Sequence, residues 1–324
     1  MPSALRLSIA LATYNGARYL GEQLESFVRQ RRPPDELVVC DDASTDDTPA
    51  ILRDFEKHAP FPVRIEVNPE RLGGVGNFTR AISLCSGDAI LLSDQDDVWL
   101  PEKVAALESS LAGAPGATLA FGDTSLVDGA LRPLGHTGFD SLGLRGGALA
   151  KIEAGHVLEA LLRFNVVTGA AMAFRAELRD LALPVGRGWV HDEWIAAIAS
   201  AVGSVVVIDR PLILYRQHDH QQIGLPKRGF LEKVDRAWRM GEPYMLRALE
   251  RAEALRDRLR ESDRPLLHSS YRALLDGKCL HARRRLEMRR GASRPGEVAR
   301  ALVRGDYARF DRGWAAALQD LFMP

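Results

Sequence analysis

Cysteine is scarce in this chain and long apolar runs are missing, and both absences exclude classes of protein. The 324 residues contain three cysteines, Cys40, Cys85 and Cys279. An odd and widely spaced set predicts neither a disulfide framework nor a zinc cluster, so we expect buried free thiols. No stretch reaches the roughly 18 uncharged apolar residues that a membrane span needs. Residues 1–6 lack the layout of a signal peptide, so we expect a cytoplasmic protein.

A net charge is also missing, because 43 basic residues balance 43 acidic ones. We therefore expect no nucleic-acid partner. The balance is uneven along the chain: from residue 227 onward there are 23 Lys and Arg against 14 Asp and Glu. A basic tail of this kind can bind anionic lipid, a phosphate-bearing acceptor or a neighbouring subunit. Alternatively, its basic residues lie on solvated helix faces and bind nothing. The sequence leaves these alternatives open.

What is present is an alternation of strand and helix patterns. Apolar runs of strand length occupy residues 7–12, 36–40, 63–67 and 89–92. Helix-periodic segments follow the first three runs, at residues 19–30, 51–55 and 75–84. This alternation predicts an α/β protein with a mainly parallel sheet that helices cover on both faces.

The rest of the chain is less regular up to residue 226 and helical beyond it. Two further strands are expected, at residues 119–121 and 205–208. The Gly-rich run at residues 135–147 predicts an exposed loop. After Pro226 a helical pattern continues nearly to the end. We therefore expect a first domain at residues 1–225 and a basic helical region at residues 226–324.

Three carboxylates, Asp94, Asp96 and Asp97, directly follow the apolar run at residues 89–92. Like charges in a poorly solvated crevice raise one another's free energy, so a cation is expected among them. Mg²⁺ and Mn²⁺ prefer oxygen ligands and leave positions free for substrate phosphates. The cluster therefore predicts a site for a metal-bound diphosphate. The alternative is a surface turn of solvated acids.

Polar residues also follow the first two expected strands. Tyr14 and Asn15 come after the first, and Asp42 comes after the second. The carboxyl ends of parallel strands form one edge of a sheet, and ligands of such sheets bind there. We therefore expect a nucleotide crevice at this edge. The glycines at residues 73–76 lack the spacing of a phosphate loop, so we interpret them as a helix entrance that brings Asn77 near the nucleotide.

Five short motifs resemble those of family 2 glycosyltransferases, and most closely the bacterial rhamnosyltransferase-like members. In chain order they are SIALATYN at residues 8–15, DDASTD at 41–46, DQDDVW at 94–99, HDEW at 191–194 and YRQH at 215–218. The resemblance covers about residues 5–225. It implies the GT-A fold, a mainly parallel central sheet flanked by helices, followed here by a C-terminal helical extension. Many relatives have Thr where this chain has Ala12, so we expect one hydroxyl contact to the base to be missing.

The resemblance also implies roles for individual residues on the donor side. Tyr14 would stack on the nucleotide base and Asp42 would accept a hydrogen bond from it. The residues expected near the donor nucleotide are Tyr14, Asn15, Asp42, Asn77 and Asp96. Those expected near the donor sugar and its phosphates are Asp94, Gly169 and Arg216. The divalent metal, Mg²⁺ or Mn²⁺, would be held by Asp97, Asp96 and His218.

On the acceptor side the resemblance implies one catalytic carboxylate. An inverting transfer needs a base on the face opposite the diphosphate, and Asp192 is the expected base. The residues expected to shape the acceptor pocket are His191, Glu193 and Trp194. Without the resemblance, Asp192 is also explained as an acidic helix N-terminus that the helix dipole favours.

The function that the resemblance implies is transfer of a sugar, with rhamnose favoured, from a dTDP- or UDP-sugar. The acceptor would be a saccharide or a lipid-linked saccharide in cell-surface polysaccharide synthesis. An alternative within the class is a donor such as UDP-glucose, UDP-galactose or UDP-GlcNAc. Alternatives from other classes are a sugar nucleotidyltransferase and an inactive nucleotide-sugar binding module. A nucleotidyltransferase should have a Gly-rich loop and a basic residue after its first strand, where this chain has residues 13–16, TYNG.

The basic tail also carries apolar side chains of the kind found at membrane interfaces. They are Trp238, Met240, Tyr244, Trp314, Leu321 and Phe322. Charge and apolar area together provide the two signals that stable peripheral binding needs. Peripheral contact with the inner face of the plasma membrane is therefore one use of the tail that the sequence leaves open, and a homodimer is another.

Overall fold

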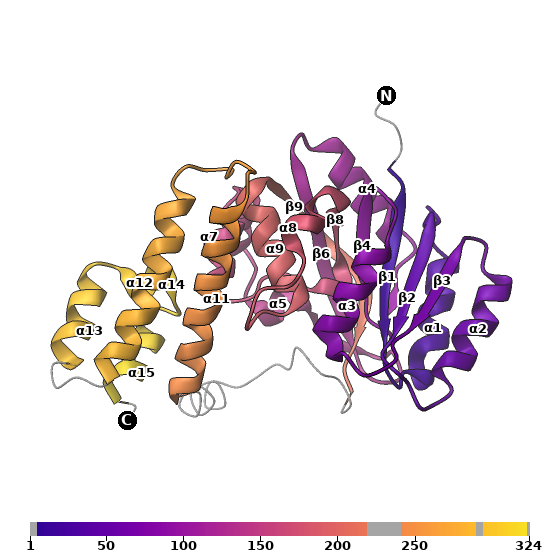
Figure 1. The fold of residues 1–324 in the computed structure, drawn as a ribbon, viewed down its shortest axis with the longest axis horizontal. Helices are drawn as coiled ribbons and strands as arrows, with labels where there is room; N and C mark the ends of the chain where they lie inside the picture. Colours follow the sequence, from indigo (N-terminus) through magenta and orange to yellow (C-terminus); the bar gives the residue numbers. More distant parts are fainter. Residues whose placement is uncertain (1–4, 219–240, 290–293, 323–324) are drawn as a thin grey trace.

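The computed structural model describes residues 5–218, 241–289 and 294–322. Helices flank a central sheet, and a stack of further helices lies at one end of the molecule, opposite α2 (Figure 1). The strands are β1 (Leu7–Thr13), β2 (Glu36–Asp41), β3 (Val63–Val67), β4 (Ala89–Ser93), β5 (Val98–Trp99), β6 (Ala117–Val127), β7 (Pro133–Thr137), β8 (Met172–Arg175) and β9 (Ser204–Arg216).

The helices up to the last strand are α1 (Ala17–Val28), α2 (Thr48–His58), α3 (Gly73–Leu84), α4 (Lys103–Gly113), α5 (Gly138–Leu142), α6 (Gly147–Glu153), α7 (Val157–Leu161), α8 (Arg179–Ala182) and α9 (His191–Val202). Two short 3₁₀ helices are η1 (Gly169–Ala171) and η2 (Ala176–Leu178). After β9 come α11 (Gly241–Glu261), α12 (Tyr271–Arg289), α13 (Arg294–Val303), α14 (Asp306–Phe310) and α15 (Trp314–Phe322).

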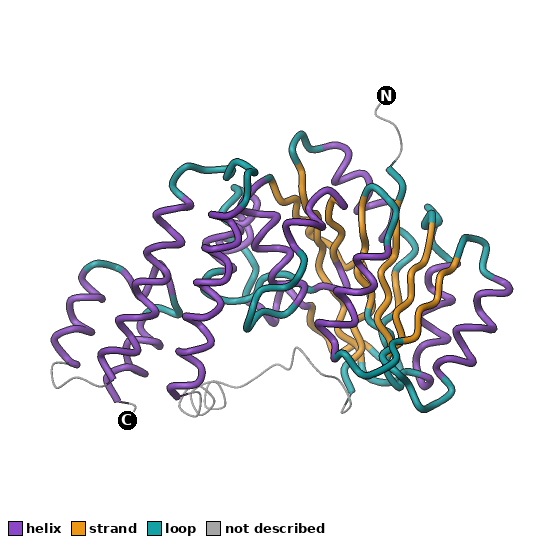
Figure 2. Tube along the Cα trace, viewed as in Figure 1, coloured by secondary structure: helices purple, strands orange, loops and turns teal. Residues whose placement is uncertain are grey.

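The sheet is parallel in its first half and mixed in its second. Its strand order is β3-β2-β1-β4-β8-β6-β9-β5, and β7 pairs with β6 outside this path. Strands β1 to β4 all run parallel, whereas β8 is antiparallel to both of its neighbours. The carboxyl ends of β1, β2 and β4 therefore lie at one edge, as the sequence predicts. Figure 2 shows the strands as one curved layer with helices on either side.

Alternate residues of the inner strands pack into two separate cores. In β1, Ala10 faces the core that α3 and α9 cover, whereas Ile9 and Leu11 face the core that α1 and α4 cover. The side chains on both faces of the strand are fully buried. The sequence of each inner strand is therefore a continuous apolar run rather than an alternation of apolar and polar residues. The fold class, the first four strands and the helices between them are confirmed.

The Gly-rich run at residues 135–147 does not form the expected exposed loop. It contains β7, α5 and the start of α6. Thr137 and Asp140 form a capping box, in which the Thr137 side chain accepts from Asp140 N and the Asp140 carboxylate accepts from Thr137 N. The buried Phe139 ring anchors the turn, and Arg145 binds Asp140. The Thr-x-x-Asp spacing was the sequence signal for this helix start, and the glycines concealed it.

The helical pattern after residue 241 is confirmed for the described part of the tail. A buried ion cluster joins its last helices: Arg285 from α12 binds Asp311 and Asp320, and the Tyr307 hydroxyl donates to Asp320 at 2.6 Å. Asp320 lies on α15, so this contact fixes which face of α15 turns inward. No helix among the described residues combines the length and apolarity needed to cross a bilayer.

Replacing Asp320 by Ala is expected to lower the free energy of unfolding by about 3 kcal/mol, because it leaves part of the buried Arg285 charge unpaired. Urea unfolding followed by circular dichroism measures the change. Glu297→Ala removes an exposed partner of Arg300 and serves as the control, with an expected change under about 0.5 kcal/mol. Equal changes in the two variants would contradict this account of the cluster.

Candidate active site

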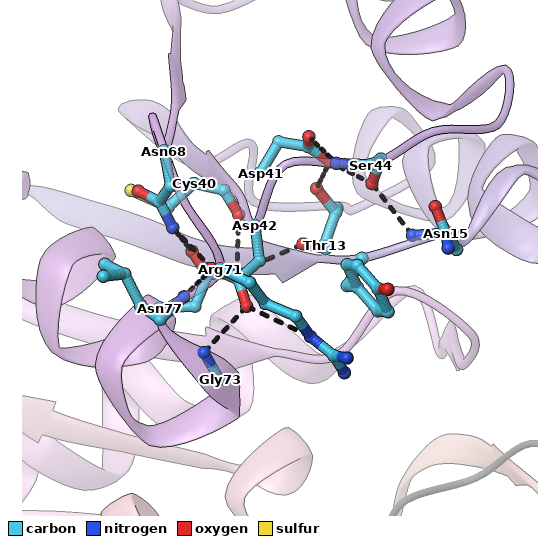
Figure 3. Close-up of polar contacts among 12 residues, drawn as sticks. Thr13, Asn15, Cys40, Asp41, Asp42, Ser44, Asn68, Arg71, Gly73 and Asn77 are labelled. Atoms are coloured by element: carbon cyan, nitrogen blue, oxygen red, sulfur yellow. Dashed lines mark hydrogen bonds and ion pairs between the residues drawn. The ribbon is translucent and has the colours of Figure 1, made fainter.

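The loops that follow β1, β2 and β4 are joined into one unit by hydrogen bonds. Asn15 N donates to Ser44 Oγ at 2.8 Å (Figure 3). Asn15 Oδ1 accepts from Thr45 N at 2.8 Å. Asn15 has φ 46°, a left-handed conformation that Asn tolerates better than most residues. From the third loop, Gln95 accepts from Tyr14 N at 2.8 Å and donates to Tyr14 O at 3.0 Å. Three separate strand ends therefore share one rigid surface.

Asp42 and Asn77 fasten the start of α3 to this surface. Asp42 Oδ1 accepts from Leu72 N at 2.7 Å, and its Oδ2 accepts from Gly73 N at 2.9 Å. These amides belong to the first turn of the helix, where donors have no partner within the helix. Asn77 is buried and donates to Cys40 O at 2.9 Å. Both predicted nucleotide-binding residues thus have structural partners, and a contact of Asp42 with a base stays a prediction.

The Tyr14 ring is covered by Arg71, a residue that the sequence analysis did not single out. The Arg71 guanidinium lies 3.9 Å from the ring centroid, and its Nε lies 4.0 Å from Asp42 Oδ2 (Figure 3). Arg71 is more than half exposed, so it can leave the ring or sandwich a base against it. The predicted stacking of a nucleotide base on Tyr14 therefore depends on the position of the Arg71 side chain.

The acidic loop, residues 94–97, turns its carboxylates in different directions. Asp97 is fully buried; its Oδ1 accepts from Arg216 N at 3.1 Å, and its Oδ2 has no hydrogen-bond partner in the described chain. Asp96 is partly exposed, and its Oδ2 lies 2.8 Å from His218 Nε2. Of the three predicted metal ligands, the structure thus brings Asp96 and His218 together at the accessible side and places Asp97 beneath them.

Arg216 holds the acidic loop in place. This fully buried side chain donates from Nε to Asp96 O at 2.7 Å and from Nη1 to Gly129 O at 2.6 Å. It also forms an ion pair with Glu22 of α1. The resemblance implies that Arg216 binds a phosphate. To do so, its guanidinium would have to share or exchange one of these partners.

Lys103 is the second cation under the loop, and the sequence analysis missed it. It is fully buried at the start of α4, with Nζ 3.1 Å from the Trp99 ring centroid and in contact with Ala170 O. Burial lowers its pKa well below the usual value, and the charges of Asp97 and Asp94 oppose that shift. A signal existed: Lys103 occupies the same helical stripe as the buried Leu107 and Leu111, where a lysine needs an internal partner.

Asp192 lies at the first turn of α9 and faces the 3₁₀ turn η1. Its Oδ2 accepts from Gly169 N at 3.1 Å, and its Oδ1 accepts from Glu193 N at 2.7 Å. A Cβ on Gly169 would lie 2.8 Å from Asp192 Cβ, so glycine permits this close approach. Burial raises the pKa of Asp192, and the two amide donors limit the rise.

Electrostatic and packing contacts connect Asp192 with the acidic loop. Burial raises the pKa of Asp94 to about 7, and the charges of Asp96 and Asp192 add to the rise. Lys103 links the two sides physically, because it contacts Ala170 O directly after Gly169 and lies near Asp97. The structure therefore brings together carboxylates that are almost one hundred residues apart in sequence.

The three predicted acceptor residues have unequal access to this site. His191 stacks on Phe78 with centroids 3.8 Å apart, and burial lowers its pKa to about 3, so the ring is neutral at pH 7. Glu193 forms an ion pair with Arg251 of α11. Trp194 is fully buried and donates to Ala182 O at 2.6 Å, and a contact of this side chain with an acceptor stays a prediction.

Comparisons with known proteins find similar sequences and similar structures. The model for glycosyl transferase family 2 matches residues 8–137. The dTDP-rhamnosyl transferase RfbG of Shigella flexneri is 30% identical over 231 residues, which cover 66% of this chain and 73% of that protein. The structure of S. aureus TarS 1–349 with UDP-GlcNAc has a TM-score of 0.58 and 16% identity, covering 86% of this chain and 72% of that one.

A second solved structure is similar over nearly the whole chain. The mannosyltransferase PcManGT of Pyrobaculum calidifontis, solved with GDP-Man and Mn²⁺, has a TM-score of 0.52 and 20% identity. The match covers 99% of this chain and 88% of that one. At these identities the two solved structures establish the fold, whereas the Shigella protein also establishes kinship in sequence.

Asp94→Asn is expected to stabilise the metal-free protein by about 1–2 kcal/mol at pH 8. The pKa of Asp94 is raised from 3.8 to about 7 on folding, so its ionisation disfavours the folded state increasingly as pH rises through that window. Well below pH 3.8 the carboxyl is neutral in both states, so most of the gain should be lost at pH 3. Denaturant unfolding with a chelator present, at pH 3 and pH 8, measures both values.

The control for that variant is Asp41→Asn, because Asp41 accepts from Thr13 Oγ1, Ser44 Oγ and Ser44 N. Removing this acceptor is expected to destabilise the protein at pH 8. A loss of stability in Asp94→Asn at pH 8 would contradict the account of crowded carboxylates.

Gly169→Ala is expected to lower kcat about tenfold to a hundredfold, because the new methyl group displaces Asp192. Release of nucleoside diphosphate from a sugar donor reports kcat, and thermal unfolding checks that the fold is intact. Gly21→Ala in α1 is the matched control, since its Cβ meets nothing within 4 Å. Full activity in Gly169→Ala would show that the position of Asp192 is unimportant.

Proposed function

Because this chain belongs to glycosyl transferase family 2, we propose that it transfers a sugar from a dTDP- or UDP-sugar to a saccharide acceptor with inversion. The chain is a nucleotide-sugar glycosyltransferase with the GT-A fold. Rhamnose is the favoured sugar, supported by the similarity to a protein named as a dTDP-rhamnosyl transferase. The observation that carries the proposal is a pair of adjacent contacts: Lys103, on the helix after the acidic loop, contacts Ala170 O, and the neighbouring Gly169 N donates to Asp192 Oδ2.

Asp192 is the proposed base. Its raised pKa makes it a stronger proton acceptor than an exposed aspartate, and the Gly169 amide holds Oδ2 in one orientation. The carboxylate would take the proton of the acceptor hydroxyl as that oxygen attacks the anomeric carbon. A single base is sufficient because the diphosphate is already an activated leaving group.

The residues of the acidic loop fit a divalent ion. Asp96 offers an accessible oxygen and His218 a ring nitrogen 2.8 Å away, while Asp97 keeps an unpartnered oxygen below them. No set of three or more such side chains among the described residues forms a complete metal site, so oxygens of the donor diphosphate would supply further ligands. When bound, Mg²⁺ or Mn²⁺ would neutralise the charge of the departing diphosphate.

The remaining donor-side residues have proposed roles that follow from their positions. Tyr14 would stack on the base once Arg71 moves or turns to its other face, and Asp94 would lie next to the sugar phosphates with its charge relieved by the ion. Burial of Lys103 favours its neutral form, whereas the charges of Asp97 and Asp94 favour its protonated form. The proposed acceptor class is a saccharide.

Thermal unfolding with a panel of nucleotide sugars tests the donor and the metal together. We expect dTDP-rhamnose or a UDP-sugar to raise Tm in the presence of Mn²⁺ and to have a much smaller effect with a chelator. Asp192→Asn should keep this rise, because it removes the base and leaves the donor site intact. Nucleoside diphosphate release should fall by about two orders of magnitude or more in the same variant.

The pH profile separates the base from a positioning role. In the native enzyme kcat/KM should fall as pH drops through the raised pKa of Asp192, because the protonated carboxyl accepts no proton. Sugar transfer at the native rate by Asp192→Asn would contradict the assignment of Asp192 as the base. Formation of pyrophosphate from a sugar phosphate and a nucleoside triphosphate would instead indicate a nucleotidyltransferase.

A further inference from the structure

Helix α15 turns its charged side inward and its apolar side outward. Asp320 and Gln319 are buried against Arg285, together with Ala316 and Ala317. The side chains that remain exposed are Trp314, Ala315, Leu318 and Phe322. A surface helix of a globular protein ordinarily has the opposite arrangement, with polar residues toward water.

The exposed side chains form one continuous stripe, which we call the α15 stripe: Trp314, Leu318 and Phe322. Their spacing of four residues puts them on the same face of the helix. Their exposed fractions are 71%, 50% and 65%. The Asp320–Arg285 contact fixes this orientation, so the stripe cannot turn inward without breaking a buried ion pair.

The charges around the stripe are mainly positive. In residues 294–322 there are five arginines and four acids, and two of those acids, Asp311 and Asp320, are buried against Arg285. Arg309 and Arg312, which directly precede the stripe, are both exposed. Arg300 and Arg304 form ion pairs with the other two acids, Glu297 and Asp306, so the exposed Arg309 and Arg312 leave this end of the chain with an excess of positive charge.

We propose that the α15 stripe binds the surface of an anionic lipid bilayer. Trp and Phe side chains partition into the interfacial region, and arginines reach from there to lipid phosphates. Apolar area and positive charge are the two signals that peripheral binding needs. Two predicted interfacial residues, Trp238 and Met240, lie outside the described residues, and the proposal does not depend on them.

A second copy of the chain fits the stripe less well. A stable interface buries about 800 Å² on each partner, whereas a nine-residue helix is only about 14 Å long. Two copies would also bring their exposed arginines together, which costs free energy. An anionic surface removes this repulsion and needs no larger apolar area.

Flotation with vesicles of phosphatidylcholine, with or without phosphatidylglycerol, tests the proposal. The full chain should float with the anionic vesicles at low salt and much less with the neutral ones or at high salt. Replacing both Trp314 and Phe322 by Ser should lower partitioning by about tenfold or more, because two apolar anchors are lost. Leu246→Ser is the matched control, since Leu246 on α11 is 50% exposed, as Leu318 is.

Fluorescence quenching by brominated phosphatidylglycerol provides a second measurement. Quenching in the full chain should decrease in Trp314→Phe, while flotation is kept. Absence of flotation with anionic vesicles at low salt would overturn the proposal. So would native flotation by the double variant, or a dimer in sedimentation that the double variant abolishes, because the stripe would then be a protein interface. Donor turnover without vesicles should be unchanged in the double variant, so this test is independent of the proposed reaction.

Discussion

The repulsion among carboxylates crowded at one sheet edge is the constraint on which this structure depends. Asp94, Asp96 and Asp97 follow the fully buried strand β4, and Asp192 lies near them at the start of α9. Repulsion of this kind persists in a native structure only when the surrounding fold holds the charged groups together. Arg216 and Lys103 are the enforcing residues, since one binds the loop from its side and the other lies beneath it. The crowded carboxylates are thus a cost to the stability of the fold.

The first half of the fold could be predicted from the sequence because both faces of the inner strands are buried. Apolar runs then mark strands directly, and the register of β1 with β2 and β4 follows from their parallel pairing. The second half was harder to predict because β8 runs antiparallel between β4 and β6, and one strand of four residues carries little periodic signal. At residues 135–147 the capping pair Thr137 and Asp140 determined the structure more strongly than the glycines did.

For the candidate site, the sequence indicated residue types and the fold supplied their partners. The motif at residues 94–97 predicted an acidic loop, but nothing local shows that Asp97 is buried and Asp96 accessible. That difference comes from β9, whose end brings Arg216 and His218 back to the loop about 120 residues later. Contacts over such separations leave no periodic trace. A single charged residue on an apolar stripe, such as Lys103, is the exception that sequence reasoning can find.

The C-terminal helices are physically coupled to the catalytic segment rather than appended to it. Arg251 of α11 pairs with Glu193, the neighbour of the proposed base, and its guanidinium lies 4.0 Å from the centroid of the Trp189 ring. Packing of α11 against α12, and of α12 against α14 and α15, continues this contact to the far end of the molecule. A surface that held α15 would therefore fix the orientation of the whole crevice. For an enzyme whose acceptor were carried on lipid, that orientation would act on the encounter with acceptor and leave the chemistry at Asp192 unchanged.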